Sequence, residues 1–343
     1  MAIVQGWLPP TRENYETLVF IWQFLYPIVS CSCRLSLIVF FGINLRFGGG
    51  IQKIGSLQWV VKWYGMGKTS VRSPLNIPGR IAWMTMEAPG FLTLVYIMNT
   101  LPQQHGIHDL PWQNRVLGGL FVRAPPPGLY PMPPSNTDHQ PKVIHYLNRA
   151  ILFPLMQPSM APIHVAVWAM AVGFQLCNAI CLGGWLSAYG AVTDAAWAAQ
   201  SPLPQFALGL AVFYVGLAGN WFHDEELREI RRKEQRRREH LRRSGGASSS
   251  SSPSSAAVAV EKHYEIPQAG LFKYMLYPHY LLEWIEWLGF WMAAGWSCAP
   301  ARAFFVNELL TMLPRAVNGK KWYVDKFGPE KINKKWAVIP GVW

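Results

Sequence analysis

Charged residues are scarce in this chain. Asp, Glu, Lys and Arg make up 15% of its 343 residues, whereas they account for about 25% of a typical soluble domain. Hydrophobic residues make up 51%, and the chain holds 17 Trp, 17 Phe and 13 Tyr. This balance excludes a disordered chain, a collagen and an ordinary soluble domain. It predicts a chain that is solvated largely by lipid.

Cysteine is also rare, and the familiar nucleotide and metal motifs are missing. The five cysteines are odd in number and lie in apolar segments, which argues against a disulfide framework. Cys177 and Cys181 share a helix face, but no His or acid nearby in sequence completes a zinc set. The chain has no Gly-x-Gly-x-x-Gly after a strand, no complete Gly-x-x-x-x-Gly-Lys-Ser/Thr loop and no His-Glu-x-x-His. Neither a soluble nucleotide-binding fold nor a metal site is therefore predicted.

Three long windows contain no Asp, Glu, Lys or Arg. They are residues 88–108, 150–193 and 195–223. A helix needs about 20 apolar residues to cross a bilayer. A buried soluble helix can imitate one such window but hardly three, so we expect an all-α, multi-pass membrane protein with about seven transmembrane helices. The expected spans are, in chain order, 18–45, 81–101, a third span split between 116–122 and 144–156, then 163–188, 206–223, 277–298 and 299–313.

The sequence divides into three parts. Residues 1–230 are expected to carry the first five spans and the substrate pocket, with a Pro-rich insertion at about 123–143. Residues 231–262 combine a basic run with a Ser-rich tract, a composition typical of a disordered loop. Residues 263–343 are expected to hold the last two spans and a cofactor-binding tail. No cleavable signal peptide is evident, so the first span is expected to direct membrane insertion.

The basic run indicates membrane topology. Residues 231–243 hold eight Lys and Arg against two Glu, a local net charge of +6 out of +12 for the chain. A basic run can bind nucleic acid, but loops rich in Lys and Arg stay on the cytoplasmic side of a membrane protein. We therefore predict a cytoplasmic location for 231–243 and no nucleic-acid partner.

Polar residues recur with helical spacing at the end of the fifth span. Asn220, Asp224, Arg228 and Arg231 are four, four and three positions apart, which places them on one helix face. One interpretation is a solvated helix end with a local ion pair of little energetic value. The other is a stripe that binds a nucleotide, since Arg suits phosphate and Asn and Asp suit ribose or amide groups.

Two further sets place acids inside apolar segments. Glu283 and Glu286 lie one turn apart beside Tyr280 and Trp287, either at the membrane interface or in a functional site.

Glu87 lies within the second span, and Tyr146 begins the later part of the third. A desolvated Glu could share a proton with a phenol, and such a pair could donate a hydrogen bond to a carbonyl that becomes an enolate. The alternative for Tyr146 is an aromatic residue of the interfacial belt.

Several motifs together resemble the steroid 5α-reductase (3-oxo-5-alpha-steroid 4-dehydrogenase) family. The segment 264–272 resembles the family's Tyr-x-Ile-Pro-x-Gly-Gly-Leu-Phe, and 283–287 matches Glu-x-x-Glu-Trp. Residues 220–231 resemble Asn-x-x-x-Asp-x-x-Leu-Arg-x-x-Arg. Further similarity lies in Pro78 to Pro89, in His145-Tyr146 with Arg149, and in Arg315-Ala316, Trp322-Tyr323, Lys326-Phe327 and Ile339-Pro340. The resemblance extends from about Tyr64 to Pro340.

The resemblance implies an enzyme of the endoplasmic-reticulum membrane whose seven helices enclose a cavity for NADPH and a steroid. The reaction would reduce a carbon–carbon double bond conjugated to a ketone, with hydride going to the β carbon. Glu87 and Tyr146 would polarise the ketone, and Trp83 and Met86 would line the substrate pocket. The residues implied to bind NADPH are Asn220, Asp224, Arg231, Tyr264, Glu283, Glu286, Arg315 and Tyr323. No metal and no obligate protein partner are implied.

The chain departs from the family pattern at four places. Met86 stands where Gln is usual, and His279 stands where many members have Asn. Residues 157–160 replace a basic Asn-Arg-Gly-Arg, so two cofactor-binding arginines are missing there. Residues 318–320 stand where some members carry a His. These departures bear on substrate choice and NADPH affinity.

Other functions fit the same residues. A reductase of this fold could act on a polyprenol or a trans-2-enoyl thioester, a possibility that Pro278-His279-Tyr280 supports. A membrane protein that binds sterol or lipid without turnover would account for the missing Gln and Arg. A membrane methyltransferase would use a different cofactor, so consumption of NADPH separates it from the reductases.

Overall fold

The computed structural model describes residues 5–25, 73–122, 150–151, 153–244 and 264–342, which are almost entirely helical. The α-helices are α1 (Arg12–Phe20), α5 (Gly79–Gln104), α6 (Trp112–Val122), α8 (Phe153–Met156), α9 (Val165–Gly184), α10 (Asp194–Gln200), α11 (Leu203–Ser244), α12 (Pro278–Ala294), α13 (Ala299–Phe327) and α14 (Pro329–Ile332). The π-helices are η1 (Ile21–Leu25) and η5 (Trp185–Tyr189), and η6 (Gly270–Lys273) is a 3-10 helix. The short strands β1 (Asn76–Ile77) and β2 (Ile163–His164) pair antiparallel.

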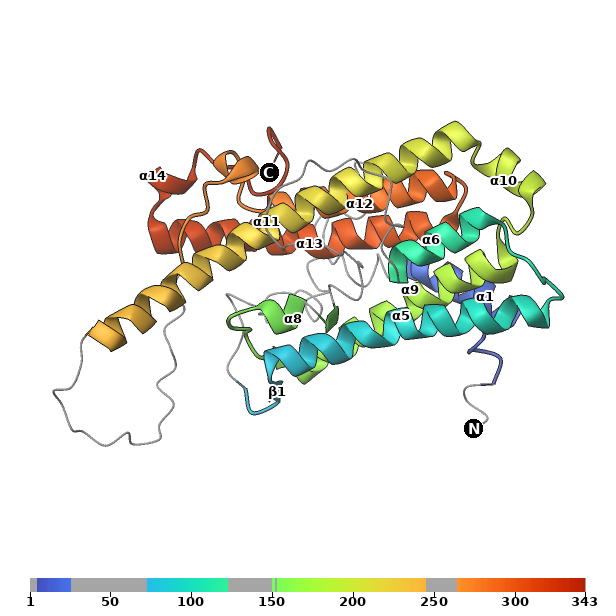
Figure 1. Cartoon of the computed structure of the whole chain (residues 1–343), viewed down its shortest axis with the longest axis horizontal. Helices are drawn as coiled ribbons and strands as arrows, with labels where there is room; N and C mark the ends of the chain where they lie inside the picture. Colours follow the sequence, from blue (N-terminus) through green and yellow to red (C-terminus); the bar gives the residue numbers. More distant parts are fainter. Residues whose placement is uncertain (1–4, 26–72, 123–149, 152, 245–263, 343) are drawn as a thin grey trace, which may run out of the picture.

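The long helices run side by side in two groups (Figure 1). In one group α5 lies along α9, and in the other α11 lies along α12, which also contacts α13. The α1 helix and η1 pack against α9, and η1 also contacts α13. The two groups of helices therefore contact each other through α1 and η1, in addition to the direct contacts between their own side chains.

Glycine allows α11 and α12 to approach closely. A Cβ atom on Gly216 would collide with the backbone of Glu286 and with the carbonyl oxygen of Leu282. A Cβ atom on Gly289 of α12 would likewise collide with the backbone of Phe213. Small residues at such crossings let two helix backbones pack in direct contact, as is common between membrane helices. This contact sets the position of the acidic face of α12 against α11.

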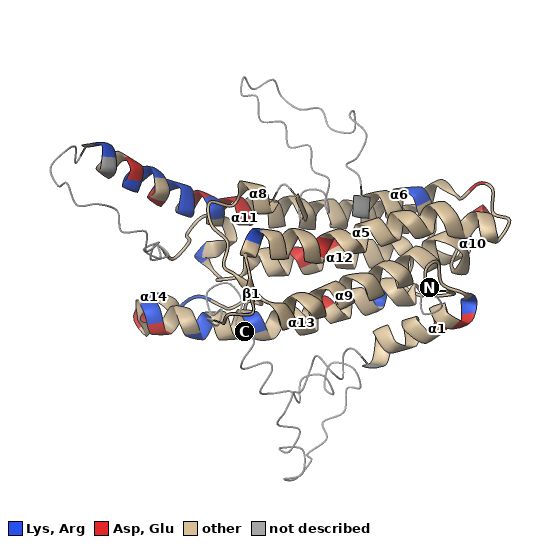
Figure 2. Cartoon of the chain, turned by 90° about the horizontal axis from the view of Figure 1, so that it is seen from below, with Lys and Arg blue, Asp and Glu red and all other residues tan. Residues whose placement is uncertain are grey.

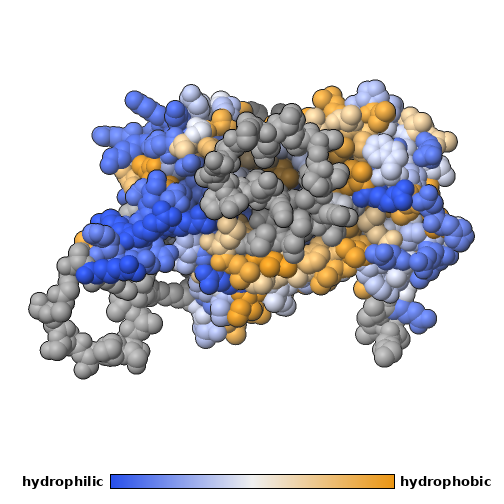
Figure 3. All heavy atoms as spheres, viewed as in Figure 1, coloured by the Kyte–Doolittle hydropathy of each residue, from blue (hydrophilic) through white to orange (hydrophobic). Residues whose placement is uncertain are grey.

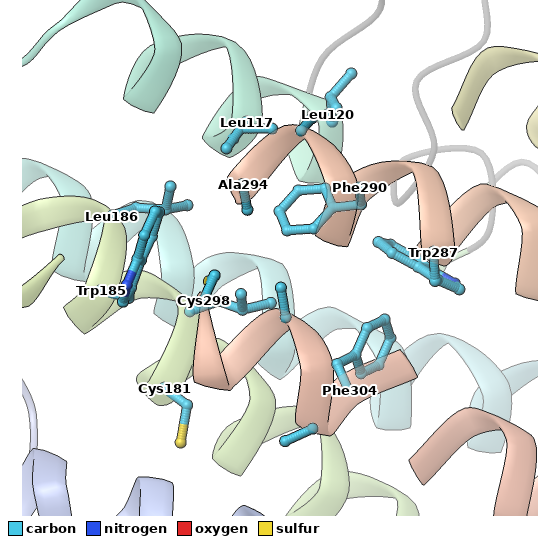
Figure 4. Packing of buried hydrophobic residues seen from close by; sticks show 14 of the residues in the cluster. Leu117, Leu120, Cys181, Trp185, Leu186, Trp287, Phe290, Ala294, Cys298 and Phe304 are labelled. Atoms are coloured by element: carbon cyan, nitrogen blue, oxygen red, sulfur yellow. The ribbon is translucent and has the colours of Figure 1, made fainter. Parts of the chain in front are cut away.

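The main hydrophobic core lies where α6, α9, α12 and α13 converge (Figure 4). Trp287 of α12 makes an edge-to-face contact with Phe304 of α13, at 4.6 Å between ring centroids. Phe290, one turn further along α12, also contacts the Trp287 ring. Such aromatic pairs add about 0.5–1.5 kcal/mol beyond the area that they bury.

A buried amide joins three elements at one end of the core. Asn114 of α6 donates from Nδ2 to the carbonyl oxygens of Leu186 and Ala191, each at 2.8 Å. Its Oδ1 accepts from Nε1 of Trp197 on α10 at 2.7 Å. The Asn114 side chain is fully buried, and these three bonds satisfy it in the described part of the chain.

Three helical stretches in the described residues are long and apolar enough to cross a membrane. They are Gly79–Gln104, Val165–Tyr189 and Leu203–Leu241. Large apolar side chains on their surfaces are exposed, which suits contact with lipid tails: Ile81, Leu92, Tyr96, Met170, Leu208 and Val215. Figure 3 shows hydrophobic residues below and to the right of the centre of the visible face, and hydrophilic ones at its left and right ends. The second, fourth and fifth expected spans therefore coincide with these helices.

The total of seven spans stays a prediction. The sixth and seventh expected spans correspond to α12 and α13, and α13 continues through Arg315 to Phe327, into the expected cofactor-binding tail. The first expected span begins in α1 and η1, but residues 26–45 lie outside the described part. The Pro-rich insertion at 123–143 lies outside it as well.

The basic run is helical, whereas a loop was expected from residue 231. The α11 helix continues without a break to Ser244, because no Gly or Pro occurs between Asn220 and Ser244. Ion pairs one turn apart also support it: Arg237 and Arg238 both pair with Glu234, at 2.7 and 2.6 Å. Figure 2 shows this arm extending from the end of the molecule that carries α8 and α14, where most Lys and Arg gather. Residues 245–262 of the expected loop lie outside the described part.

Candidate active site

A buried carboxyl group lies at the contact between α5 and α9. Glu87 is 4% exposed and accepts a hydrogen bond at Oε2 from Nε2 of Gln175, at 2.5 Å. Gly90 makes room for this contact, since a Cβ atom there would lie 3.0 Å from Oε1 of Gln175. The expected catalytic acid is therefore held by an amide from a different helix.

The two residues expected to line the substrate pocket precede Glu87 on α5. Met86 is buried in a small cluster with Ala82, Ile163 and Val167. The ring of Trp83 lies 5.6 Å from that of Phe153 on α8. Trp83 thus lies one turn before Glu87 and contacts the short helix that precedes β2 and α9.

Tyr146, the expected phenol partner of Glu87, lies outside the described residues. The acid–phenol pair therefore remains a prediction.

Two expected cofactor residues meet between α11 and α12. Nδ2 of Asn220 donates to Oε2 of Glu283 at 3.3 Å, and both side chains are buried. Glu286, one turn further along α12, is fully buried beside the close contact with Gly216. The two acids therefore face α11 inside the protein, and the interpretation that both lie exposed at the interface is wrong.

A second group of expected cofactor residues gathers near the basic side chain of Arg231. Burial raises the pKa of Tyr264, and the nearby positive charge of Arg231 opposes that increase. Tyr323 on α13 also lies within the electrostatic reach of Arg231, is buried and stacks on Phe327. The ring of Trp322 contacts Tyr264 with 4.8 Å between centroids. Residues from α11, α13 and the 264–273 segment thus converge here.

The remaining two expected residues lie close to these groups. Arg315 on α13 places its guanidinium 5.9 Å from the ring centroid of Tyr280 on α12. Asp224 lies one turn after Asn220 on α11 and is half-buried. The expected cofactor residues named so far come from four parts of the chain. The α11 helix carries Asn220, Asp224 and Arg231, α12 carries Glu283, α13 carries Arg315 and Tyr323, and the segment before η6 carries Tyr264.

The segment from 264 to 277 is held in place by the C-terminal tail. Backbone N–H groups of Leu276 and Tyr277 donate to the carbonyl oxygens of Trp336 and Ala337, each at 2.9 Å. The ammonium of Lys335, 7% exposed, donates to Oε1 of Gln268 at 3.1 Å and to the carbonyl oxygen of Phe272. Burial lowers the pKa of Lys335. The tail therefore fixes the segment that presents Tyr264.

His223 ties the same segment to α11. Its Nδ1 lies 2.7 Å from the carbonyl oxygen of Gly219, and the backbone N–H of Leu271 donates to its Nε2 at 3.1 Å. The Leu271 contact makes Nε2 an acceptor, so the matching tautomer has its proton on Nδ1, facing the carbonyl oxygen of Gly219. His223 follows Asn220 by one turn, so it couples the loop to the polar stripe of α11.

Sequence reasoning missed the residues that support the expected ones. Gln175 lies in a charge-free window, and the presence of an amide side chain in an apolar span was the available signal. Lys335 lies in a basic tail, and nothing in the sequence distinguishes it from the neighbouring lysines. Gln157, which accepts from Arg231 at 2.9 Å, falls in the segment noted only for missing arginines.

Comparison with known proteins supports the family. Residues 256–343 match the family model described as 3-oxo-5-alpha-steroid 4-dehydrogenase. The chain is 30% identical to steroid 5-alpha-reductase DET2 of Solanum lycopersicum over 288 residues, which cover 82% of this chain and 88% of that protein. It is 27% identical to 3-oxo-5-alpha-steroid 4-dehydrogenase 1 of Rattus norvegicus, covering 90% and 96%. It is also 30% identical to the uncharacterized protein C9.08c of Schizosaccharomyces pombe, covering 80% and 89%.

The described structure has several apolar helices and a buried acid between two of them. These features are consistent with a membrane-bound oxidoreductase. The length and extent of the matches settle the family: the chain belongs to the steroid 5-alpha-reductase (3-oxo-5-alpha-steroid 4-dehydrogenase) family.

Proposed function

We propose that this chain uses NADPH to reduce the carbon–carbon double bond of a Δ4-3-oxosteroid or a related enone lipid. The observation that carries the proposal is Glu87, a carboxyl group that is buried and hydrogen-bonded to Gln175 next to Trp83. A buried acid can act as a hydrogen-bond donor to a ketone as that ketone gains negative charge. The names of the relatives supply the substrate class.

The residues of α11, α12 and α13 suit a phosphorylated dinucleotide. Asn220 and Glu283 offer amide and carboxylate groups for ribose hydroxyls or the nicotinamide amide, and Arg231 offers a guanidinium for phosphate. When bound, NADPH supplies a hydride to the β carbon of the enone. Glu87, together with Tyr146, would hold the ketone oxygen and stabilise the enolate, and the α carbon would then take a proton.

We further propose an endoplasmic-reticulum membrane location with the basic arm of α11 in the cytoplasm. The excess of Lys and Arg at that end of the molecule supports this orientation. The bilayer and the lipid substrate are then the expected partners.

The test uses microsomes that contain the full chain or its Glu87→Gln variant, supplied with NADPH and progesterone. Mass spectrometry should detect the 5α-dihydro product with the wild type and a loss of at least about 100-fold with Glu87→Gln, the usual scale for a general acid. An equal product yield from the two proteins would remove Glu87 from the chemistry.

A binding measurement separates the alternatives. Saturable NADPH binding that is lost in Asp224→Ala, without steroid product, would retain a reductase and shift the substrate to a polyprenol or an enoyl thioester. Neither product nor NADPH binding would leave a non-catalytic sterol- or lipid-binding protein.

A further inference from the structure

A cleft lies between one face of α13 and the C-terminal tail. Its volume is about 410 Å³, within the range of roughly 300–1,000 Å³ that is usual for small-molecule sites. None of its described lining residues is among those expected to bind substrate or cofactor. We call it the tail cleft, and the lining residues that matter here are Val317, Lys320, Lys321, Val324, Asp325 and Trp336.

The tail cleft faces away from the candidate active site. Arg315, Gly319 and Tyr323 are four positions apart, so they form one row along α13. A Cβ atom on Gly319 would collide with the hydroxyl group of Tyr277, which directly precedes α12, so this row faces α12. The lining residues of the cleft are offset from this row by about half a helical turn. The cleft is therefore separate from the expected cofactor residues.

The cleft carries positive charge that the described structure does not neutralise. Lys320 is half-buried in its wall, and Lys321 is exposed. Neither lysine forms a hydrogen bond or an ion pair in the described part of the chain. Lys321 does not pair with Asp325 either, although the two residues are one turn apart. Two ammonium groups and one carboxylate leave a net charge of +1, which matches the single negative charge of a phosphodiester.

The rest of the lining is apolar. Val317 and Val324 come from α13, and the ring of Trp336, a residue that is 40% exposed, comes from the tail. The backbone of Trp336 is fixed, because its N–H donates to the carbonyl oxygen of Tyr274 at 2.8 Å and its own carbonyl accepts from Leu276 at 2.9 Å. A small soluble anion would leave these apolar side chains in water. An anion that carries a hydrocarbon stem would cover them.

The cleft lies where lipid headgroups are expected. The seventh expected span ends at residue 313, one turn before Val317. Residues 315–335 hold seven Lys and Arg against Asp325 and Glu330, a net charge of +5. Figure 2 shows α14, which directly follows α13, at the same end of the molecule as the basic arm of α11. Trp and Lys are typical of the membrane–water interface, and basic residues there attract anionic lipids.

We infer that the tail cleft binds the headgroup of an anionic phospholipid. Lys320 and Lys321 hold the phosphate, and the upper part of the acyl chains lies against Val324 and Trp336. The inference goes beyond the proposed function and does not depend on it. A lipid in the cleft contacts α13 and the tail at once, and the same tail pairs through its backbone with the segment that leads into α12.

The test is native mass spectrometry of the purified full chain in neutral detergent, titrated with phosphatidylserine and, separately, with phosphatidylcholine. The wild type should bind phosphatidylserine at least about tenfold more tightly. The double variant Lys320→Gln/Lys321→Gln should raise the Kd for phosphatidylserine about tenfold or more and leave that for phosphatidylcholine unchanged. Lys331→Gln/Lys334→Gln is the matched control, because it removes the same charge from exposed lysines outside the cleft, and its Kd should stay within about twofold.

A second variant tests the apolar half of the cleft. Trp336→Gln should raise the Kd for phosphatidylserine about threefold to tenfold, since the apolar contact with the acyl stem is lost. Thermal melting checks that this variant is folded. Inorganic phosphate should not displace the lipid from the wild type. Displacement by inorganic phosphate at a concentration equal to that of the lipid would make the cleft a site for a soluble anion and overturn the inference.

Three further results would overturn it. The first is equal binding of phosphatidylserine and phosphatidylcholine by the wild type, and the second is equal binding of phosphatidylserine by the double variant and its control. In both cases the proposed function stands, because the cleft is separate from the active site. The third is a tenfold loss of NADPH binding in the double variant, which would place the two lysines in the cofactor site.

Discussion

Gln175 on α9 donates its side-chain amide to Oε2 of Glu87 on α5 over 2.5 Å, although the two residues are 88 positions apart in the chain. The bond fixes which way the carboxyl group faces, because the amide occupies one of its two oxygens. Gln is usual at position 86 in the family that the motifs resemble, and Met86 cannot form such a bond. Gln175 therefore supplies an amide beside the acid from another helix.

Replacing Gln175 with Leu should slow the reaction without weakening the binding of the cofactor. The variant removes one hydrogen bond to Glu87 while keeping a side chain of similar size. We expect kcat for enone reduction to fall about tenfold, the effect of roughly 1.4 kcal/mol on the barrier, with the Kd for NADPH unchanged. Steady-state kinetics and titration on the same preparation check this. A variant with wild-type kcat would show that the bond does not position the acid.

Replacing Gly216 with Ala should separate α11 from α12. The added Cβ would collide with the backbone of Glu286, which cannot move without shifting the helix. We expect a loss of about 1–3 kcal/mol in unfolding free energy, and weaker NADPH binding because Asn220 lies one turn away. Gly173→Ala on α9 is the control: its Cβ would meet no atom within 4 Å, so stability should be equal or higher. Thermal melting in detergent compares the two, and equal melting temperatures would contradict the close contact.

Replacing Asn114 with Leu should loosen the junction of α6, η5 and α10. The carbonyl oxygens of Leu186 and Ala191 and the indole N–H of Trp197 would lose their partner inside the core. The expected loss is at least about 2–4 kcal/mol. Asn99→Leu is the matched control, because in the described part of the chain its exposed amide bonds only to the carbonyl oxygen of Val95. Similar denaturant midpoints for both variants would show that the buried network contributes little.

Replacing Lys335 with Met should release the 264–273 segment from the tail. The variant removes donors to Gln268, Phe272 and Lys273. Limited proteolysis should cut within this segment faster than in the wild type, by about tenfold if roughly 1.4 kcal/mol of local stability is lost. Lys334→Met, the exposed neighbour, should leave the rate unchanged. Equal rates for both variants would show that the tail is held by its backbone bonds alone.

The pH dependence of stability gives a second test of Lys335. Burial lowers the pKa of this ammonium in the folded chain, so between that pKa and about 10.5 the unfolded chain binds more protons than the folded one. The stability contributed by this group therefore rises as the pH increases through that window. Lys335→Met should lack this increase in melting curves taken from pH 8 to pH 10.5. A variant with the same slope as the wild type would assign the pH dependence to other groups.

Much of the secondary structure and many of the candidate residues could be predicted from the sequence. The second, fourth and fifth spans are charge-free windows of sufficient length, and length and hydropathy are local properties that need no partner. The helical course of the basic run was missed, since charge density was given more weight than the absence of Gly and Pro between Asn220 and Ser244.

The apolar helices, the polar stripe of α11 and the acids of α12 can be read from the sequence, because each depends on residue type and helical spacing within one segment. The bond between Gln175 and Glu87, the sharing of Gln157 by Arg80 and Arg231, and the hold of Lys335 on the segment before α12 are visible only in the folded chain. These partners are chosen by how helices far apart in the chain pack, and local periodicity carries no information about which faces meet.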